Sequence, residues 1–258
     1  MRLGLEGRTA LVMAGSQGIG LSSAQGFHAA GANVAICARS QVPLDEAAAS
    51  MPGCFSMVAD VTDEAQIEKF VAATREKFGA IDVLVNNAGG PPPGLFVDLD
   101  DGDWGRAVEL TLMSAIRATR AVLPDMKERG WGRIVNVSSF GVKKPVPNLT
   151  LSNSIRMAVL GWAKTLANQV GPEGITVNTV CPGWTRTARV HKLLAEQSAQ
   201  SGKSEAEIEA GLVQNIPLRR AGEPEDVANL VVFLASEAAG YMTGTAIAVD
   251  GGAAQGYA

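Results

Sequence analysis

Short β-branched, apolar runs alternate with longer segments of helical periodicity along the whole chain, and few folds accept such a pattern. The runs span 9–14, 33–38, 55–60, 82–87, 132–138, 175–180 and 245–250, and helical patterns between them include 64–78 and 224–236. Strands that are apolar almost throughout, each followed by a helix, are typical of a parallel sheet covered on both faces. We therefore expect an α/β fold in which residues 1–258 form a single doubly wound domain.

Residues 184–217 are the one long departure from this alternation. The segment is polar and helix-prone, and it lies between the sixth apolar run and the final helix–strand unit. No composition break, internal repeat or low-complexity tract divides the rest of the chain. An excursion of this length beyond the strand ends predicts a lid over a substrate site.

Charge and cysteine usage exclude several classes of function. The net charge is −4 and the pI is about 5.3, so no basic patch indicates nucleic acid or an anionic membrane as a partner. Cys37, Cys54 and Cys181 are scattered and lack the spacing of a metal site, which favours a reduced, cytoplasmic setting. The apolar run at 9–14 is short and follows Glu6 and Arg8, unlike a signal peptide or a membrane span. We expect a small-molecule partner.

A glycine-rich turn follows the first apolar run directly and precedes a helical pattern. Its candidate cofactor-binding residues are Gly15, Ser16, Gln17, Gly18, Ile19 and Gly20. Between a strand and a helix, such a turn lets a pyrophosphate approach the backbone and the helix N-terminus. A plain glycine-rich turn is the alternative, but the context favours dinucleotide binding.

The residue after the second apolar run bears on which dinucleotide is bound. Arg39 stands where an acidic residue would hold the 2′-hydroxyl of NAD(H). A guanidinium offers a planar donor fork for a 2′-phosphate, although an arginine at a strand end is also an ordinary surface residue. Arg39 thus favours NADP(H) over NAD(H).

Four further motifs resemble the short-chain dehydrogenase/reductase family. They are Asn86-Asn87-Ala88-Gly89, the run GRIVNVSS at 132–139, Cys181-Pro182-Gly183-Trp184 with Thr187, and the closing segment 222–252. The resemblance covers nearly the whole chain. It implies a seven-stranded Rossmann-type sheet, a nicotinamide cofactor, and a carbonyl or alcohol substrate as in 3-oxoacyl-thioester reductases. It also implies a homotetramer that pairs the helices near 104–128 and 152–170 across one interface and the final helix and strand across another.

The resemblance also implies further contacts to the cofactor. Asp60 and Val61 would lie near the adenine, and Asn87, Ala88 and Gly89 near the adenine-side ribose. The remaining implied cofactor residues are Arg156, Pro182, Gly183, Thr185 and Thr187.

The family's catalytic set is a Ser, a Tyr-x-x-x-Lys pair and an Asn, and only one of these four side chains is retained. The serine falls on Ser139, the tyrosine on Ser152, the lysine on Arg156 and the asparagine on Thr111. Because Ser152 and Arg156 are four residues apart, a helix would place them on one face. They can act as a pair that holds and polarises a ligand, or as a helix cap and a solvent-exposed arginine.

Proton transfer is the step that these replacements affect. A serine hydroxyl is much less acidic than a phenol of pKa about 10, and arginine is permanently charged at neutral pH. Neither Tyr241 nor Tyr257 is followed by a lysine four residues later. The remaining candidates are water, Lys143 just past Ser139, and His191 in the expected lid; solvated side chains are the alternative for both residues.

Two functions from different classes follow. The first is an NADP(H)-dependent oxidoreductase with an altered proton-transfer set, which the retained Ser139, the cofactor turns and the lid favour. The second is a catalytically silent NADP(H)-binding or regulatory protein, because loss of a proton donor costs about two to four orders of magnitude in rate.

Overall fold

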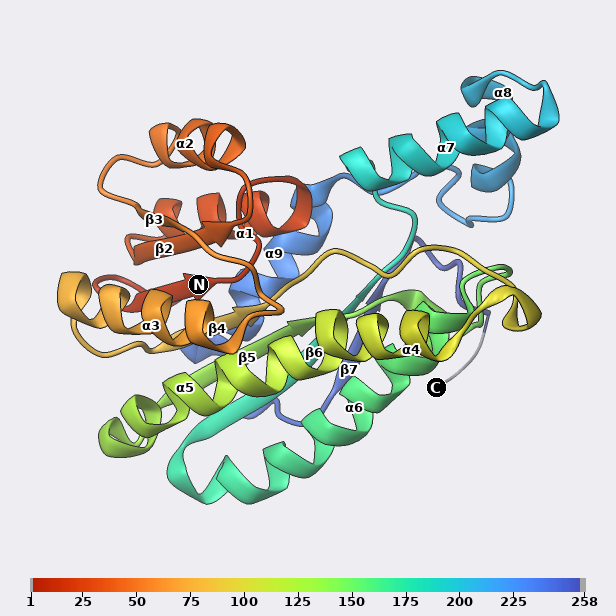
Figure 1. The fold of residues 1–258 in the computed structure, drawn as a ribbon. Helices are drawn as coiled ribbons and strands as arrows, with labels where there is room; N and C mark the ends of the chain where they lie inside the picture. The colour runs from red at the N-terminus through yellow and green to blue at the C-terminus, as the bar shows by residue number, and fades with distance from the viewer. Residues whose placement is uncertain (1, 256–258) are drawn as a thin grey trace.

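The computed structural model describes residues 2–255 and contains a seven-stranded parallel sheet (Figure 1). Its strands are β1 (Thr9–Val12), β2 (Asn33–Ala38), β3 (Phe55–Val58), β4 (Val83–Asn86), β5 (Gly132–Val137), β6 (Ile175–Pro182) and β7 (Ala246–Val249). The spatial order is β3-β2-β1-β4-β5-β6-β7, so the direction of winding reverses between β1 and β4. In such sheets, ligands bind at the carboxyl ends of the strands beside this reversal.

Helices cover both faces of the sheet. They are α1 (Gly18–Ala29), α2 (Gln41–Ala49), α3 (Glu64–Phe78), α4 (Asp101–Val108), α5 (Ser114–Arg129), α6 (Thr150–Val170), α7 (Ala188–Ser201), α8 (Glu205–Val213) and α9 (Pro224–Leu234). The helices α1, α2 and α9 pack on one face, and α3, α5 and α6 pack on the other. The expected doubly wound α/β fold is therefore confirmed.

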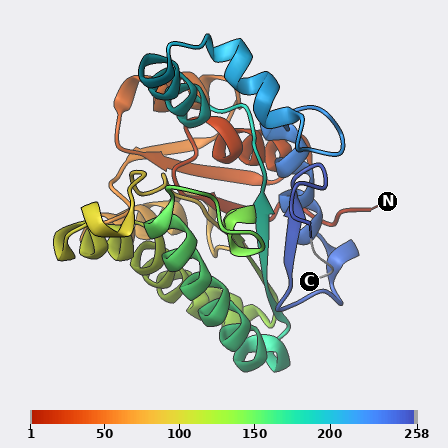
Figure 2. The same cartoon turned by 90° about the vertical axis from the view of Figure 1, so that its right-hand side faces the viewer.

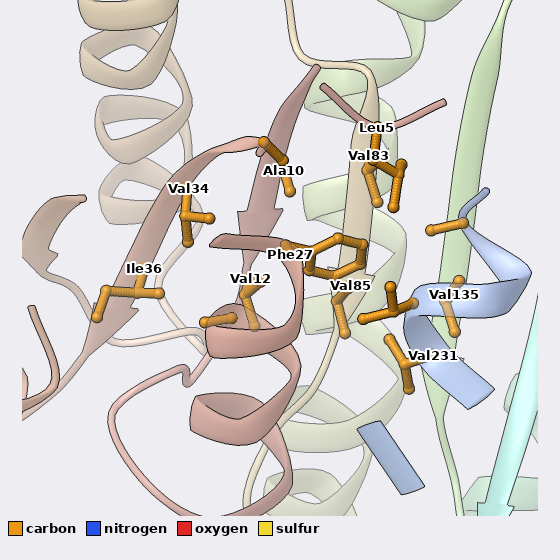
Figure 3. Packing of buried hydrophobic residues seen from close by; sticks show 14 of the residues in the cluster. Leu5, Ala10, Val12, Phe27, Val34, Ile36, Val83, Val85, Val135 and Val231 are labelled. Carbon is orange, nitrogen blue, oxygen red and sulfur yellow. The ribbon is translucent and has the colours of Figure 1, made fainter. Parts of the chain in front are cut away.

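The strand register aligns apolar side chains into rows that the helices cover. Ile36, Val12, Val85 and Val135 are register partners across β2, β1, β4 and β5 and belong to one buried cluster. Figure 3 shows Phe27 of α1 in the middle of this cluster, and its side chain is fully buried. Burial on both faces explains why the strands read as continuous apolar runs.

Most of the expected elements differ from the observed ones by one or two residues at their ends. The apolar runs 9–14 and 55–60 end as strands at Val12 and Val58. Ala14 already adopts a left-handed φ of 48°, which leaves the extended conformation and starts the glycine-rich turn. The helix expected over 224–236 ends at Leu234.

The helix expected near 104–128 is interrupted by one π-helical turn. This turn, η2, spans Glu109–Met113 between α4 and α5. A π turn inserts one extra residue into a helix and often marks a functional site. Here the turn contains Thr111, whose side chain is buried.

The segment expected to be a lid contains α7 and α8. These helices lie apart from the layers of the sheet, beyond the strand ends (Figures 1 and 2). The base of the segment is closed by backbone hydrogen bonds from Gly222 N to Trp184 O (2.7 Å) and from Arg186 N to Gly222 O (2.8 Å). The excursion therefore leaves and re-enters the body at one point.

Within the described residues, no helix combines the length and the apolar composition that crossing a bilayer requires.

Candidate active site

A cleft of about 1200 Å³, open to solvent, lies at the carboxyl ends of the central strands. Its walls come from segments that follow β1, β4, β5 and β6 and from the first turns of α6 and α7. The lining residues from the loops after β1 and β4 are Ala14, Gln17, Gly18, Ile19, Gly20, Asn87, Ala88, Gly89 and Gly90. The cleft thus lies at the point where the strand order reverses.

The glycine-rich turn after β1 is packed too tightly for larger residues. A Cβ atom at Gly20 would lie 2.5 Å from Ala14 O and 2.6 Å from Asn87 Nδ2. Asn87 Nδ2 donates to Met13 O (3.2 Å) and Ala14 O (3.1 Å), which joins the end of β4 to the turn. Gly18 has a φ of +53°, a conformation that glycine adopts without strain.

The N-terminus of α1 is free to bind an anion. Gln17 precedes the helix without a side-chain cap, and the first turn carries no acidic residue. In contrast, a carboxylate or hydroxyl caps α3, α4, α7 and α8. Free N–H groups and the helix dipole are suited to a pyrophosphate, so the residues of this turn fit a dinucleotide. Gly15 and Ser16 lie in the same turn, with Gly15 buried against Ile36.

The residues expected near the adenine end lie beyond the cleft, after β2 and β3. Arg39 is exposed, and no ion pair or side-chain hydrogen bond joins it to the described residues. Asp60 Oδ1 accepts hydrogen bonds from Thr62 N (2.9 Å) and Thr62 Oγ1 (2.8 Å). Val61 lines a second, smaller cavity behind the cleft. Arg39 is thus an unpaired cation at the sheet edge.

The segment after β6 forms the opposite wall. Pro182, Gly183, Thr185 and Thr187 all line the cleft. Gly183 N donates to Val249 O (2.9 Å), which holds this wall to β7. Thr187 caps α7 through its side chain. A Cβ atom added at Gly18 would lie 3.1 Å from the Thr187 methyl carbon, Cγ2. The two walls therefore meet at Gly18 and Thr187.

Ser152 and Arg156 lie on the first turns of α6 and are hydrogen-bonded to each other. Arg156 Nε donates to Ser152 Oγ (3.1 Å), and Arg156 Nη1 donates to the carbonyl oxygens of Val137 (3.1 Å) and Ser138 (2.9 Å) at the end of β5. Both side chains line the cleft together with Ser139. Ser139 Oγ accepts from Gly141 N (3.0 Å), which leaves its proton free to donate. The structure thus brings these three residues together.

The charge of Arg156 is held in an enclosed position. Burial, followed by repulsion from Arg189, lowers the pKa of Arg156 to about 10. At neutral pH the guanidinium therefore remains charged and cannot exchange a proton with a substrate. It can hold and polarise an oxygen atom.

A small cavity behind Arg156 is surrounded by oxygen atoms without partners. Asn86 Oδ1, Thr111 Oγ1 and Ser138 Oγ are buried and accept or donate no hydrogen bond within residues 2–255. Their residues line this cavity together with Arg156. Buried polar atoms left unpaired at such a cavity are the usual partners of an ordered water molecule.

The other candidates for proton transfer do not reach the cleft. Lys143 follows the 3₁₀ turn Phe140–Val142 and does not line the cleft. Its charge partly offsets the rise that burial causes in the pKa of Cys181. His191 is exposed on α7, Tyr241 is fully exposed, and Tyr257 lies outside the described residues. Burial raises the pKa of the Cys181 thiol to about 11, so it is protonated at neutral pH.

Two residues of the site are absent from the sequence-based prediction. Asn153 clamps the loop after Ser139, because its Oδ1 accepts from Val146 N (3.2 Å) and its Nδ2 donates to Val146 O (2.9 Å). Arg189 of α7 also lines the cleft. The sequence signal for Arg189 is a cation two residues after Thr187, but a permanently charged arginine is not a candidate for proton transfer.

Residues 2–255 contain no group of three or more His, Cys, Asp or Glu side chains that could hold a metal ion.

The chain is similar to known proteins in sequence and in structure. A family model described as enoyl-(acyl carrier protein) reductase matches residues 13–254. Oxidoreductase UcpA of Escherichia coli O157:H7 is 36% identical over 252 residues, which cover 96% of this chain and 95% of the relative. The 3-oxoacyl-[acyl-carrier-protein] reductase FabG of Haemophilus influenzae is 34% identical over 249 residues, covering 96% and 98%. The structure of L-sorbose reductase from Gluconobacter frateurii, complexed with NADPH and L-sorbose, superposes with a TM-score of 0.95 at 32% identity and covers 99% of this chain and 100% of its own.

Proposed function

The chain belongs to the short-chain dehydrogenase/reductase family, and from this membership we propose that it is an NADP(H)-dependent oxidoreductase that interconverts a carbonyl and an alcohol. The observation that carries the proposal is the convergence of Ser139, Ser152 and Arg156 on the cleft that the glycine-rich turn also lines. The substrate is a small molecule held between these residues and α7. The lid then comprises residues 184–217 of a single domain.

Each part of the proposed site has a separate task. Bound nicotinamide supplies or accepts the hydride. Ser139 donates a hydrogen bond to the substrate oxygen, and so does Ser152, whose hydroxyl already accepts from Arg156. Arg156 stabilises negative charge that develops on this oxygen.

Water is the proposed proton source. The unpartnered oxygen atoms of Asn86, Thr111 and Ser138 surround a cavity that Arg156 also lines. A water molecule held there would lie directly behind the oxygen-binding residues and would carry the proton that the replaced side chains cannot.

Preference for NADP(H) rests on Arg39, with the glycine-rich turn, Asp60, Val61 and Asn87 to Gly89 as further cofactor residues. In the structure of L-sorbose reductase, the protein is complexed with NADPH. The actinorhodin polyketide ketoreductase, 34% identical with a TM-score of 0.91 over 96% of this chain and 98% of its own, also has NADPH in its structure. We further propose a cytoplasmic homotetramer, in which α4, α5 and α6 pair between copies.

A second candidate function is NADP(H) binding without turnover. One observation favours it: within the described residues, no Tyr, His, Lys, Cys, Asp or Glu side chain lines the cleft. Loss of general acid catalysis costs about 10²- to 10⁴-fold in rate. Tight NADPH binding with no oxidation by any carbonyl compound would support this candidate over the enzyme.

The test combines cofactor binding with turnover. We expect the protein to oxidise NADPH with at least one compound of a carbonyl panel, and Arg156→Met to reduce both this rate and NADPH affinity.

Arg39→Ala should weaken NADPH binding about 10- to 100-fold and NADH binding little, because a charged hydrogen bond contributes about 1.5–3 kcal/mol. Lys69→Ala removes an exposed cation of α3 and serves as the control. Equal losses for both cofactors in Arg39→Ala would contradict the assignment.

A further inference from the structure

The cleft contains a second guanidinium that the proposed chemistry does not use. Arg189 lies on the first turn of α7 and lines the cleft. Its Nη2 donates to Pro91 O (2.9 Å), and its guanidinium fills the space that a side chain at Gly90 would occupy. Arg189 therefore extends from the lid across the cleft to the loop after β4.

Arg189 differs from Arg186 and Arg220 in having no acidic partner. Arg186, three residues earlier, pairs with Glu209 (2.9 Å) and Glu223 (2.7 Å), and Arg220 pairs with Asp226. No ion pair among residues 2–255 includes Arg189, and the carbonyl of Pro91 is its only hydrogen-bond partner there. Most of its donor capacity is thus free.

The charge balance in the cleft is positive, although the chain has a net charge of −4. Arg156 and Arg189 are the only charged residues that line the cleft within the described part of the chain. Burial lowers the pKa of Arg189, and its charge in turn lowers the pKa of Arg156. Two cations in one cleft, with no acidic side chain among the described lining residues, favour an anionic ligand.

The residues of the cleft indicate which kind of anionic ligand would bind to Arg189. The cleft that Arg189 lines also has apolar side chains, among them Leu149, Val190 and Leu193. A planar guanidinium binds a carboxylate through two parallel hydrogen bonds. A ligand that fits has an apolar chain and a carboxylate end.

We propose that Arg189 binds a carboxylate of the substrate, so that the substrates are oxo acids and the corresponding hydroxy acids with apolar chains. This inference rests on the proposed function, since Ser139 and Ser152 hold the oxygen that is reduced. The cofactor pyrophosphate has the same anionic chemistry, and the experiment separates the two sources.

Binding is measured first, because it does not depend on turnover. Hexanoate and hexanamide are titrated into the protein–NADPH complex, and binding is followed by tryptophan fluorescence, to which Trp184 in the cleft contributes. We expect hexanoate to bind about 10- to 100-fold more tightly than hexanamide. In Arg189→Gln this preference should disappear, whereas Lys192→Gln, an exposed cation on the same helix, should retain it.

Turnover is then compared for 2-, 3- and 4-oxo acids of four to eight carbons and for their methyl esters. The wild-type protein should favour the acids in kcat/KM, and Arg189→Gln should bring the acid-to-ester ratio of kcat/KM close to one.

Equal binding of hexanoate and hexanamide overturns the proposal. So does an Arg189→Gln variant that loses NADPH affinity while it keeps the preference for hexanoate, because Arg189 would then serve the cofactor. If hexanoate is preferred but no oxo compound is reduced, the carboxylate site stands and the proposed enzymatic function fails.

Discussion

At the scale of single residues, the candidate site depends on glycine positions where a larger side chain would clash with neighbouring atoms. Gly20 is the clearest case, because a Cβ there would lie within 2.6 Å of both Ala14 O and Asn87 Nδ2. We expect Gly20→Ala to weaken NADPH binding more than about tenfold and to lower the free energy of unfolding by about 1–3 kcal/mol. Fluorescence titration with NADPH and urea denaturation measure the two effects.

The control is Gly211→Ala, at an exposed position in α8 where the added Cβ would have no neighbouring atom within 4 Å. There alanine favours the helix by about 0.5–1 kcal/mol, and NADPH affinity should not change. Wild-type NADPH affinity in Gly20→Ala would show that the dinucleotide does not lie over this turn.

The sequence predicts residue positions better than residue contacts. The spacing of Ser152 and Arg156 places them on one helix face, and the structure has them on the first turns of α6. The hydrogen bonds from Arg156 to the carbonyls of Val137 and Ser138 could not be predicted, because they depend on how α6 packs against the end of β5. Lys143 lies near Ser139 in sequence, but a turn carries it away from the cleft.

At the scale of elements, the start of α9 has a pH-dependent stabilising contact. Asp226 accepts hydrogen bonds from Arg220 (2.6 Å and 3.1 Å) and from Glu223 N (2.8 Å). The Arg220 contact and then the backbone hydrogen bond lower the pKa of Asp226 to about 2. The pKa in an unfolded chain is about 3.9. Because the folded pKa is the lower one, this stabilisation is complete above about pH 5 and is lost as the pH falls from about 4 to about 2.

We therefore expect Asp226→Asn to be less stable than the wild-type protein by a constant amount between about pH 5 and 7. The difference should shrink as the pH falls below about 4, as measured by urea denaturation across this range. Glu68→Gln, an exposed position in α3, should show no such trend. A difference that is independent of pH down to about 3 would mean that the charge of Asp226 does not stabilise α9.

Helix patterns give the bounds of elements well when periodicity is unbroken. The pattern at 64–78 matches α3 to the residue, with Asp63 as its cap and Gly79, at a φ of 81°, after its end. The π turn at Glu109–Met113 was not predicted. A single inserted residue barely alters the apolar pattern, and the turn packs against α6, which is distant in sequence.

At the scale of the whole molecule, exposed apolar side chains bear on the proposed tetramer. Met157 is 51% exposed on α6, on one of the helices expected to pair between copies. Light scattering should give a mass about four times 26.8 kDa. Met157→Lys should reduce this mass, because it places a charge in the expected interface. Val42→Lys, at a 68% exposed position of α2, is the matched control, and a wild-type monomer at micromolar concentration would contradict the proposal.

The global architecture was the most predictable level. Buried parallel strands and covering helices follow from periodicity alone, and the seven strands occur at the seven apolar runs. The order of the strands does not follow from periodicity, because any permutation would bury the same residues. That β1 and β4 are neighbours, with the cleft at their carboxyl ends, comes from the structure.

The hydrogen bond between Arg156 Nε and Ser152 Oγ has a consequence for how such a site evolves. A phenol at position 152 would not present its oxygen at the place of Oγ, and a lysine at position 156 would have to satisfy two strand carbonyls and the serine with a single nitrogen. Each single replacement therefore passes through a mismatched intermediate. We therefore expect the two positions to change together, so that relatives carry the Ser–Arg pair or lack both residues.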